Sequence, residues 1–413
     1  MKNSIPDRSR MRSNAKILTA LSVLLLGCYL ISGIRYATYH PHRSANYLWG
    51  AYHVHSTMSD GLHSAEEIAR QAQIAGVNLV LLTDHGAPNL SSTVYRRVIG
   101  DVIIAGGSEV QLAEGRLTFF GARGIPQLRL SSLPPEAIHD ISGRGGFPIL
   151  AYPEDPEFGW KYWESDLSPS GIEILNLFTT LRCSSLWDKL GLALYYPFSR
   201  YYFMKLISFS PGSMERWDGF LQTRKTWGLL ATDAHGGFRI GRWLKAELPS
   251  YADAFSFVGL GIDKRYVSNP EAAVRKGDFF NCLRGAGEPE RFDFFAVYGR
   301  NIYNPGSNTP LHSNLKVEVQ DRNQRVWLVL KKNGAKILET VGNHLELLEA
   351  EYGVYRVEVF LEDHPLLPAD VPWIVSNPIF VGSKRNELFS SMAARRSRRF
   401  KGKLVSGMIP PQG

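Results

Sequence analysis

The residues best suited to chemistry are histidines and acidic side chains near the ends of short apolar runs. A His-x-His pair, His53 and His55, opens a segment that continues to Asp60. Because side chains alternate along a β-strand, both imidazoles are expected on one face, where they can bind one metal ion. Asp60, on the loop just beyond, can reach a neighbouring ion. The pair alone is a weak signal, since histidine pairs also occur on ordinary surfaces.

Four further candidate ligands support the metal interpretation. Each lies beyond an apolar run typical of a buried strand; they are His85, Glu109, Asp233 and His235. In a parallel sheet or barrel, functional side chains gather where the strands end at their carboxyl ends. We therefore expect these residues to converge with the His-x-His segment. Mixed imidazole and carboxylate ligands suit Zn²⁺, Mn²⁺ or Fe²⁺, and spacing alone does not choose among these ions.

The elements that would position these residues follow an alternating β and α pattern from Tyr47 to about Arg242. Apolar runs at 79–82, 102–105, 149–151, 172–175 and 229–231 predict strands. Ser64, followed by two glutamates and an amphipathic stretch, predicts a capped helix that ends at Gly76. The fold class predicted for this part is α/β.

A second domain is predicted after Asn308, because the pattern changes to the alternation of antiparallel strands. Asn333 and Gly334 supply a tight turn between two of these strands. We expect a β-sandwich domain over 308–382, with an immunoglobulin-like fold. The residues after it, 384–413, look like a basic, flexible tail.

The N-terminal region has the features of a membrane anchor. Residues 17–34 carry no charge and would span about 27 Å as a helix. Five basic side chains precede this run within a short tail, residues 1–16, so the positive-inside rule places the N-terminus in the cytoplasm and the body outside it. A cleaved signal peptide and a buried core helix are the alternatives.

A third region, residues 186–209, is rich in aromatic side chains but too interrupted by charges to span a membrane. One interpretation is a hydrophobic insertion that covers the barrel. The other is a surface that rests in the headgroup region of the bilayer.

The net charge of +8 does not indicate a nucleic-acid partner. The tails 1–16 and 384–413 carry +4 and +7, which leaves −3 for the rest of the chain. The body therefore has no basic excess to follow a phosphodiester backbone. The three cysteines lie far apart in the sequence and form neither a disulfide framework nor a Cys-x-x-Cys pair.

Taken in order, these motifs resemble the polymerase and histidinol phosphatase (PHP) family of metal-dependent phosphoesterases. The resemblance rests on HxHxxxSDG from His53, Thr-Asp-His at 83–85, Gly-x-Glu at Glu109 and Asp-Ala-His at 233–235, and it covers about 47–245. It implies a distorted (β/α)7 TIM-like barrel over 47–300, as in a membrane-associated bacterial branch of the family. It also implies two metal ions. His53, His55, Glu109 and Asp233 would bind one, and Asp60, His85 and His235 the other.

Two positions depart from the family's pattern. Arg116 and Tyr152 stand where the family usually has histidines, and both histidines would have served the same third metal. Their joint absence favours a two-metal cluster. Arg116 is then a candidate to replace the missing positive charge opposite a phosphate.

The function predicted is that of a membrane-anchored, extracytoplasmic phosphoesterase acting on a phosphomonoester or phosphodiester, with Asp60 or His235 as proton donor to the leaving group. Candidate substrate-binding residues are Arg116, Tyr152, Glu173, Asn176 and Arg239. Glu173 and Asn176 could equally be structural, and Arg239 could lie on a solvated loop. Two other functions stay open: a catalytically impaired module that binds an anion or a protein, and a metal-dependent hydrolase of C–N or carboxyl ester bonds.

Overall fold

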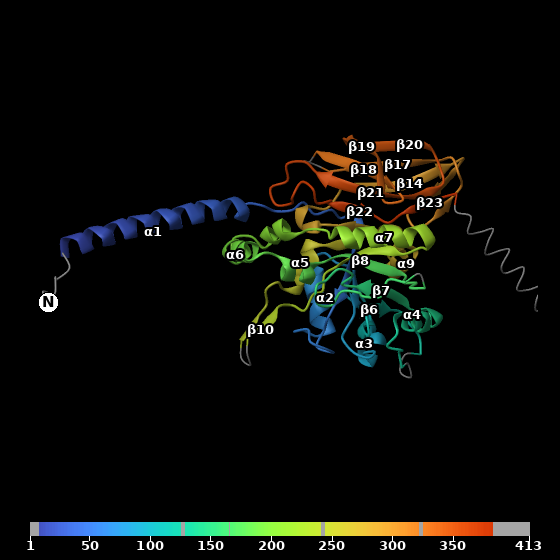
Figure 1. Ribbon diagram of the computed structural model, residues 1–413, viewed down its shortest axis with the longest axis horizontal. Helices are drawn as coiled ribbons and strands as arrows, with labels where there is room; N and C mark the ends of the chain where they lie inside the picture. Colours follow the sequence, from blue (N-terminus) through green and yellow to red (C-terminus); the bar gives the residue numbers. More distant parts are fainter. Residues whose placement is uncertain (1–7, 125–128, 165, 241–243, 322–324, 383–413) are drawn as a thin grey trace, which may run out of the picture.

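The computed structural model describes residues 8–124, 129–164, 166–240, 244–321 and 325–382, without the side chains of 8–18, 238–240 and 244–246 (Figure 1). The tail 384–413 and the first seven residues of the tail 1–16 lie outside the described residues. Within them the chain is a mixed α/β protein with several sheets.

Two sheets carry the candidate ligands. The five-stranded sheet has the order β5 (Gly107–Leu112), β6 (Gly115–Phe120), β7 (Phe147–Ala151), β8 (Gly171–Asn176) and β9 (Trp227–Ala231). One half of the twelve-stranded sheet of the described chain has the order β3 (Arg96–Ile99), β4 (Val102–Ala105), β2 (Leu79–Leu82), β1 (Tyr47–Val54), β12 (Gly259–Asp263) and β13 (Phe280–Cys282). Strands form at each of the five predicted apolar runs.

The two sheets meet beside the candidate ligands. Beyond the end of β1, the amide of His55 donates to the Ala234 carbonyl after β9, and the Ala234 amide donates to the His53 carbonyl. Beyond the end of β2, the amide of Glu109 in β5 donates to the Asp84 carbonyl. Seven strands, β1, β2, β5, β6, β7, β8 and β9, are thus linked in a ring at this end of the described sheets.

Helices surround these sheets (Figure 1). Helix α2 (Ala65–Ile74) starts as predicted, because the Ser64 side chain accepts a hydrogen bond from the amide of Glu67. The other described α-helices of the body are α3 (Leu90–Thr93), α4 (Pro134–Gly143), α5 (Leu177–Cys183), α6 (Leu186–Tyr195), α7 (Pro211–Thr223), α8 (Tyr251–Phe257) and α9 (Pro270–Lys276). Three short 3₁₀ helices are described at η2 (Arg200–Leu206), η3 (Lys264–Tyr266) and η4 (Arg284–Ala286). A small ribbon joins β10 (Phe238–Ile240) to β11 (Leu244–Ala246).

The C-terminal part is antiparallel, apart from one short parallel pair. Its strand Ser313–Gln320 alternates buried with less buried residues as expected, whereas the strand Gly353–Leu361 is buried almost throughout. The twelve-stranded sheet continues from β13 into β22 (Ile374–Ser376), β21 (Gly353–Leu361), β23 (Ile379–Val381) and β16 (Asn308–Thr309). In addition, β18 (Val326–Lys332) pairs with β21, and β19 (Ala335–Val341) pairs with β18. A four-stranded sheet has the order β15 (Asn301–Tyr303), β14 (Arg291–Tyr298), β17 (Ser313–Gln320) and β20 (His344–Ala350).

This part differs from the expected domain in two ways. Strands β14 and β15 pair within its four-stranded sheet, although they precede residue 308. In addition, β22 pairs with both β13 and β21, so one sheet runs from the body into the C-terminal part. The predicted turn at Asn333 and Gly334 connects β18 to β19, and both residues have positive φ.

Helix α1 (Arg8–Ala37) extends away from the body (Figure 1). By length and composition, its stretch Thr19–Ala37 is apolar enough to cross a membrane. Helix α6 and η2 lie within the aromatic segment 186–209, and α6 packs beside the C-terminal end of α1.

Candidate metal centre

His53 and His55 approach each other because of an irregular end to β1. The pairing of β1 with β2 shifts register between Tyr52 and Val54, and His53 has a φ of 65°. The predicted alternation of a regular strand is therefore not what positions the two rings. They lie with centroids 5.1 Å apart and are fully buried.

The hydrogen bonds of His53 fix which nitrogen faces the site. Its Nδ1 lies 2.6 Å from the Glu173 carboxylate, which orients the ring as an Nδ1–H donor. Its Nε2 then faces Glu109 Oε2 at 3.0 Å and Asp233 Oδ1 at 3.6 Å. A neutral Nε2 and two carboxylate oxygens are all acceptors, so a positive charge is needed between them, either a proton or a metal ion.

Glu109 divides its two oxygens between different partners. Oε2 faces the imidazoles of His53, His55 and His85, the last two at 3.4 and 3.5 Å. Oε1 accepts a hydrogen bond from Arg116 at 3.0 Å. The guanidinium also donates to Gln111 and lies 4.0 Å from the Phe158 ring centroid.

Asp233 is arranged in the same way. Its Oδ2 accepts a 2.6 Å hydrogen bond from the Tyr152 hydroxyl. Its Oδ1 faces His53, His55 and His235 at 3.4 to 3.7 Å and has no hydrogen-bond partner among the described residues. Arg116 and Tyr152, the two departures from the family pattern, thus each occupy one carboxylate oxygen and leave the other oxygen to the imidazoles.

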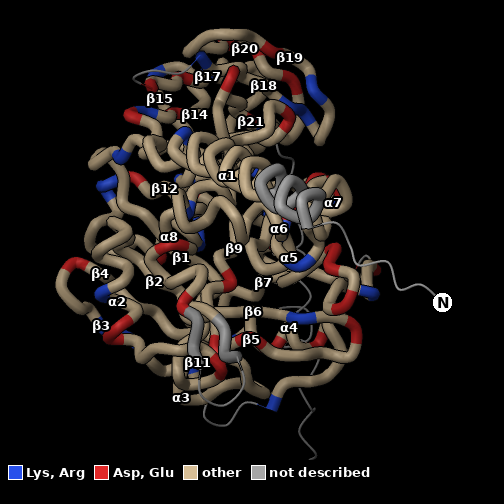
Figure 2. Tube along the Cα trace, turned by 90° about the vertical axis from the view of Figure 1, so that its left-hand side faces the viewer, with Lys and Arg blue, Asp and Glu red and all other residues tan. Residues whose placement is uncertain are grey.

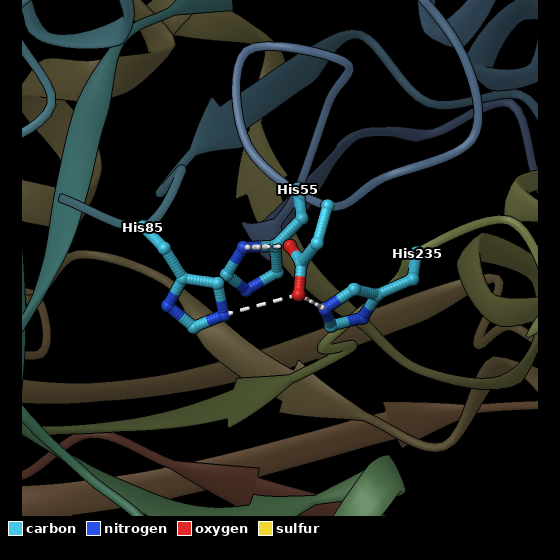
Figure 3. Close-up of side chains that lie close together, drawn as sticks. His55, His85 and His235 are labelled. Carbon is cyan, nitrogen blue, oxygen red and sulfur yellow. Dashed lines mark ion pairs between the residues drawn. The ribbon is translucent and has the colours of Figure 1, made fainter.

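A second group of side chains lies at the mouth of the site (Figure 3). The imidazoles of His55, His85 and His235 lie close together, with ring centroids of His55 4.4 Å from His85 and 4.2 Å from His235. The Asp60 carboxylate lies 3.4 to 3.6 Å from a nitrogen of each ring. Nδ1 of His235 lies 3.0 Å from the Asp233 carbonyl, so its Nε2 faces Asp60.

The donor atoms fit metal binding. One group contains His53, His55 and Asp233, and the other His55, Asp60, His85 and His235; within each group the donor atoms lie within 4.8 Å of one another. His55 belongs to both groups, and neither of its buried ring nitrogens has a hydrogen-bond partner in the described chain. Because an unpaired buried polar atom is costly, this ring is suited to bridge or bind cations.

The pKa shifts of the buried residues Glu109 and His53 show that the site favours bound positive charge. Burial would raise the pKa of Glu109, but the imidazoles of His53 and His55 outweigh burial and hold it well below its usual range. Burial likewise would lower the pKa of His53, but Asp233 and Glu173 raise it well above the usual value. The carboxylates thus hold protons on buried imidazoles, and a divalent ion would displace those protons.

Three of the predicted substrate-binding residues, Glu173, Asn176 and Arg239, belong to neither of the two groups of candidate ligands. Glu173 is buried and bonds His53, the Tyr52 hydroxyl, the Tyr152 amide and the Asn176 side chain. Asn176 caps α5 by accepting from the Thr179 amide. These contacts favour the structural alternative for both residues. Arg239 lies in β10, and its side chain is outside the described residues.

Asp84 is a buried residue that supports the loop beside the site. Its buried carboxylate accepts hydrogen bonds from Ser56, Ser59 and Ser92 and so anchors the loop that carries Asp60. Tyr251, the first residue of α8, donates a hydrogen bond from its hydroxyl to the His55 carbonyl. The Thr-Asp-His motif identifies Asp84 in the sequence as a residue near the site, whereas no local sequence pattern identifies Tyr251.

The comparisons with known proteins give a structural likeness but no match in sequence. No protein-family model matches the sequence, and no curated protein matches it. Among solved structures, the chain is similar to a two-domain protein from Bacteroides vulgatus described as containing a predicted PHP-like metal-dependent phosphoesterase. The identity is 12%, the match covers 82% of this chain and 98% of that one, and the TM-score is 0.34. At this TM-score, the activity of that protein does not transfer to this chain.

Proposed function

We propose that this protein is a membrane-anchored, metal-dependent phosphoesterase of the PHP type. The observation that carries the proposal is the convergence of His53, His55, Asp60, His85, Glu109, Asp233 and His235 on two adjoining groups of donor atoms. The two orphaned nitrogens of His55 support a site made for cations. We infer a distorted (β/α)7 barrel from the ring of strands and an immunoglobulin-like sandwich from the C-terminal sheets.

The residues present fit two divalent ions. His53, Glu109 and Asp233 would hold one ion, Asp60, His85 and His235 the other, with His55 between them. Zn²⁺, Mn²⁺ and Fe²⁺ all suit this mixture of ligands. When bound, such ions would supply Lewis acidity and would also lower the pKa of water, so that hydroxide is available to attack phosphorus near neutral pH.

The chain's own residues then bind the ester and handle the proton. Arg116 lines the cavity at the site, and its guanidinium would bind a phosphoryl oxygen. Asp60 and His235, the two alternative proton donors, line the same cavity. His235 is favoured, because burial would raise the pKa of the Asp60 carboxyl but hydrogen bonds with His235 and His85 hold it well below its usual range. Tyr152 holds Asp233 in place through its hydroxyl.

The membrane placement is also part of the proposal. Helix α1 would cross the bilayer once with the N-terminus in the cytoplasm, as the basic residues before its apolar stretch Thr19–Ala37 favour. The body would lie on the other side, with the segment 186–209 at the membrane surface. A phosphate ester and membrane lipid are the partners we propose.

The function is tested with the full-length protein in detergent. We expect hydrolysis of p-nitrophenyl phosphate or bis(p-nitrophenyl) phosphate that is lost with a chelator and restored by Zn²⁺, Mn²⁺ or Fe²⁺. His235→Ala should lower turnover at least about tenfold, as expected for loss of a ligand or proton donor. The matched control is His139→Ala, at an exposed histidine of α4, which should leave turnover unchanged.

Other outcomes would favour the other functions. A metal-loaded protein that cleaves p-nitrophenyl acetate or an amide but no phosphoester would favour a carboxyl ester or C–N hydrolase. A folded, metal-loaded protein inert to all of these compounds would favour a binding module.

A further inference from the structure

The cavity at the candidate metal centre has two chemically different walls. Its volume is about 590 Å³. One wall carries Asp60, His85, Asp233, His235 and Arg116. The other wall is apolar; its larger side chains are Phe158, Phe178, Leu181, Phe203, Leu248 and Phe257. A phosphate group alone requires only the first wall, so the second indicates a substrate with a sizeable apolar part.

Much of the apolar wall belongs to one continuous stretch of chain. Phe178 and Leu181 come from α5, and Phe203 comes from η2. Between them lies α6, which buries none of its residues. Its large exposed side chains include Trp187, whose relative exposure is 80%. The stretch that lines the cavity therefore also presents apolar side chains outward.

This stretch is fixed to the C-terminal end of α1. The Tyr29 hydroxyl donates to the Leu194 carbonyl at 2.8 Å, and the Ser32 and Tyr195 hydroxyls lie 3.0 Å apart. Gly33 allows Phe198 to approach, because a Cβ at Gly33 would lie 2.6 Å from the ring. Figure 2, seen along α1, shows α5 and α6 beside it.

Because α6 contacts the C-terminal end of α1, α6 would lie at a bilayer surface if α1 spans the membrane. The contacts with α6 fall in the last turns of the apolar stretch Thr19–Ala37. Tyrosine and tryptophan are enriched at this depth, where headgroups meet acyl chains. The exposed face of α6 and the apolar wall of the cavity would thus be close to the same leaflet.

We propose that the substrate is an amphiphilic phosphoester taken from this leaflet, with its phosphate at the metal-binding side chains and its alkyl part against Phe178, Leu181 and Phe203. This rests on the proposed function. The reaction is a hydrolysis: the oxygen of water bonds to phosphorus, the P–O ester bond breaks, and the leaving alcohol takes the proton. No oxidant or reductant is needed.

The alkyl-binding wall is tested with two soluble esters that share a leaving group, methyl p-nitrophenyl phosphate and octyl p-nitrophenyl phosphate. We expect the full-length protein in detergent to cleave the octyl ester with a kcat/KM at least about tenfold higher, because each buried methylene strengthens binding about fourfold. The double substitution Phe178→Ser and Leu181→Ser should bring the ratio to within about threefold of unity, while cleavage of the methyl ester changes less than about twofold. Leu348→Ser, on the exposed face of β20, should leave the ratio unchanged.

The outcomes separate this inference from the function on which it rests. Cleavage of the methyl ester without preference for the octyl ester would overturn the inference alone. Cleavage of neither ester, nor of p-nitrophenyl phosphate, would overturn both.

A second experiment tests whether the substrate reaches the protein from the bilayer in which α1 would be embedded. Hexadecyl p-nitrophenyl phosphate is placed in phosphatidylcholine vesicles, and the full-length protein is reconstituted either in the same vesicles or in separate ones. We expect cleavage at least about tenfold faster in the same vesicles. Equal rates in the two arrangements would contradict delivery from the membrane and indicate a soluble amphiphile.

Discussion

Three residues at the centre of the site adopt backbone conformations that are uncommon for residues other than glycine. His53, Tyr152 and Asp233 have φ values of 65°, 53° and 46°. Such conformations cost about 1–3 kcal/mol each and persist where the surroundings enforce them. Here Glu173 bonds both the His53 ring and the Tyr152 amide, and Tyr152 in turn bonds Asp233. We interpret this network as the support that orients the metal-binding atoms.

A prediction at this scale concerns Arg116 and Tyr152. If their side chains replace a third ion by each occupying one carboxylate oxygen, the double variant Arg116→His and Tyr152→His should bind about one more divalent ion per chain than the wild type. Histidine tolerates the positive φ at position 152 better than most residues. Metal content by mass spectrometry measures this, with each single variant as a control. An unchanged ion count in a folded double variant would contradict the account.

At the scale of elements, the segment 177–206 has two environments. Through α5 and η2 it lines the cavity, and through α6 it packs on α1. A residue such as Trp187, exposed on a helix that touches a potential membrane span, is suited to the lipid headgroup region.

The tryptophans of the chain make this testable. The apolar stretch Thr19–Ala37 of α1 has no tryptophan, and Trp49, Trp160, Trp217, Trp227 and Trp373 are buried. We expect lipids brominated near the headgroup to quench part of the fluorescence of the reconstituted full-length protein, and Trp187→Phe to remove that quenched part. The variant Trp327→Phe, at a half-buried tryptophan of the C-terminal part, is the control. Equal quenching in the wild type and in Trp187→Phe would place α6 away from the bilayer.

The positions of the strands could be predicted from the sequence better than the contacts between distant segments that support the site. Apolar runs located β2, β4, β7, β8 and β9, and the alternation after Asn308 indicated the antiparallel strands of the C-terminal part, because burial on one or both faces dictates local side-chain types. The convergence of the seven candidate ligands was expected from strand ends. The bulge at His53, the Glu173 network and the continuity from β13 to β22 arise from long-range pairing, which leaves no local pattern.

At the scale of the whole molecule, contacts of the residues after α1 tie this helix to the rest of the described chain. Arg43 and the buried Arg284 both bind Glu288, which also accepts from the Ser44 amide. Tyr39 contacts His364, which lies beyond β21 in the C-terminal part. The segment between α1 and β1 therefore contacts both the body and the C-terminal sheets.

The His364 contact predicts acid sensitivity. Its Nδ1 accepts from the amides of Leu366 and Leu367, so Nε2–H donates to Tyr39, whose hydroxyl donates to the Gly285 carbonyl. Burial lowers the pKa of His364 to about 4. The neutral ring therefore contributes stability that is fully present above about pH 6.5 and is lost as the pH falls toward 4. We expect a loss of up to about 2 kcal/mol, allowing for solvent screening at this half-buried ring.

Thermal unfolding in a fixed detergent at pH 7.5 and pH 4.5 measures this effect. His364→Gln should show a smaller fall in melting temperature between the two pH values than the wild type. His312→Gln, at an exposed histidine of the C-terminal part, should behave like the wild type. The same fall in all three proteins would assign the acid sensitivity to other groups.

The central claim is that seven histidine and acidic side chains form a centre for divalent ions. The most direct measurement is the metal content of the purified full-length protein, by mass spectrometry, for the wild type, His55→Ala and the control His139→Ala. We predict about two ions per chain in the wild type and in His139→Ala, with one or both lost in His55→Ala, because His55 faces both groups. A folded wild type with no tightly bound ion, or an ion content that His55→Ala leaves unchanged, would contradict the claim.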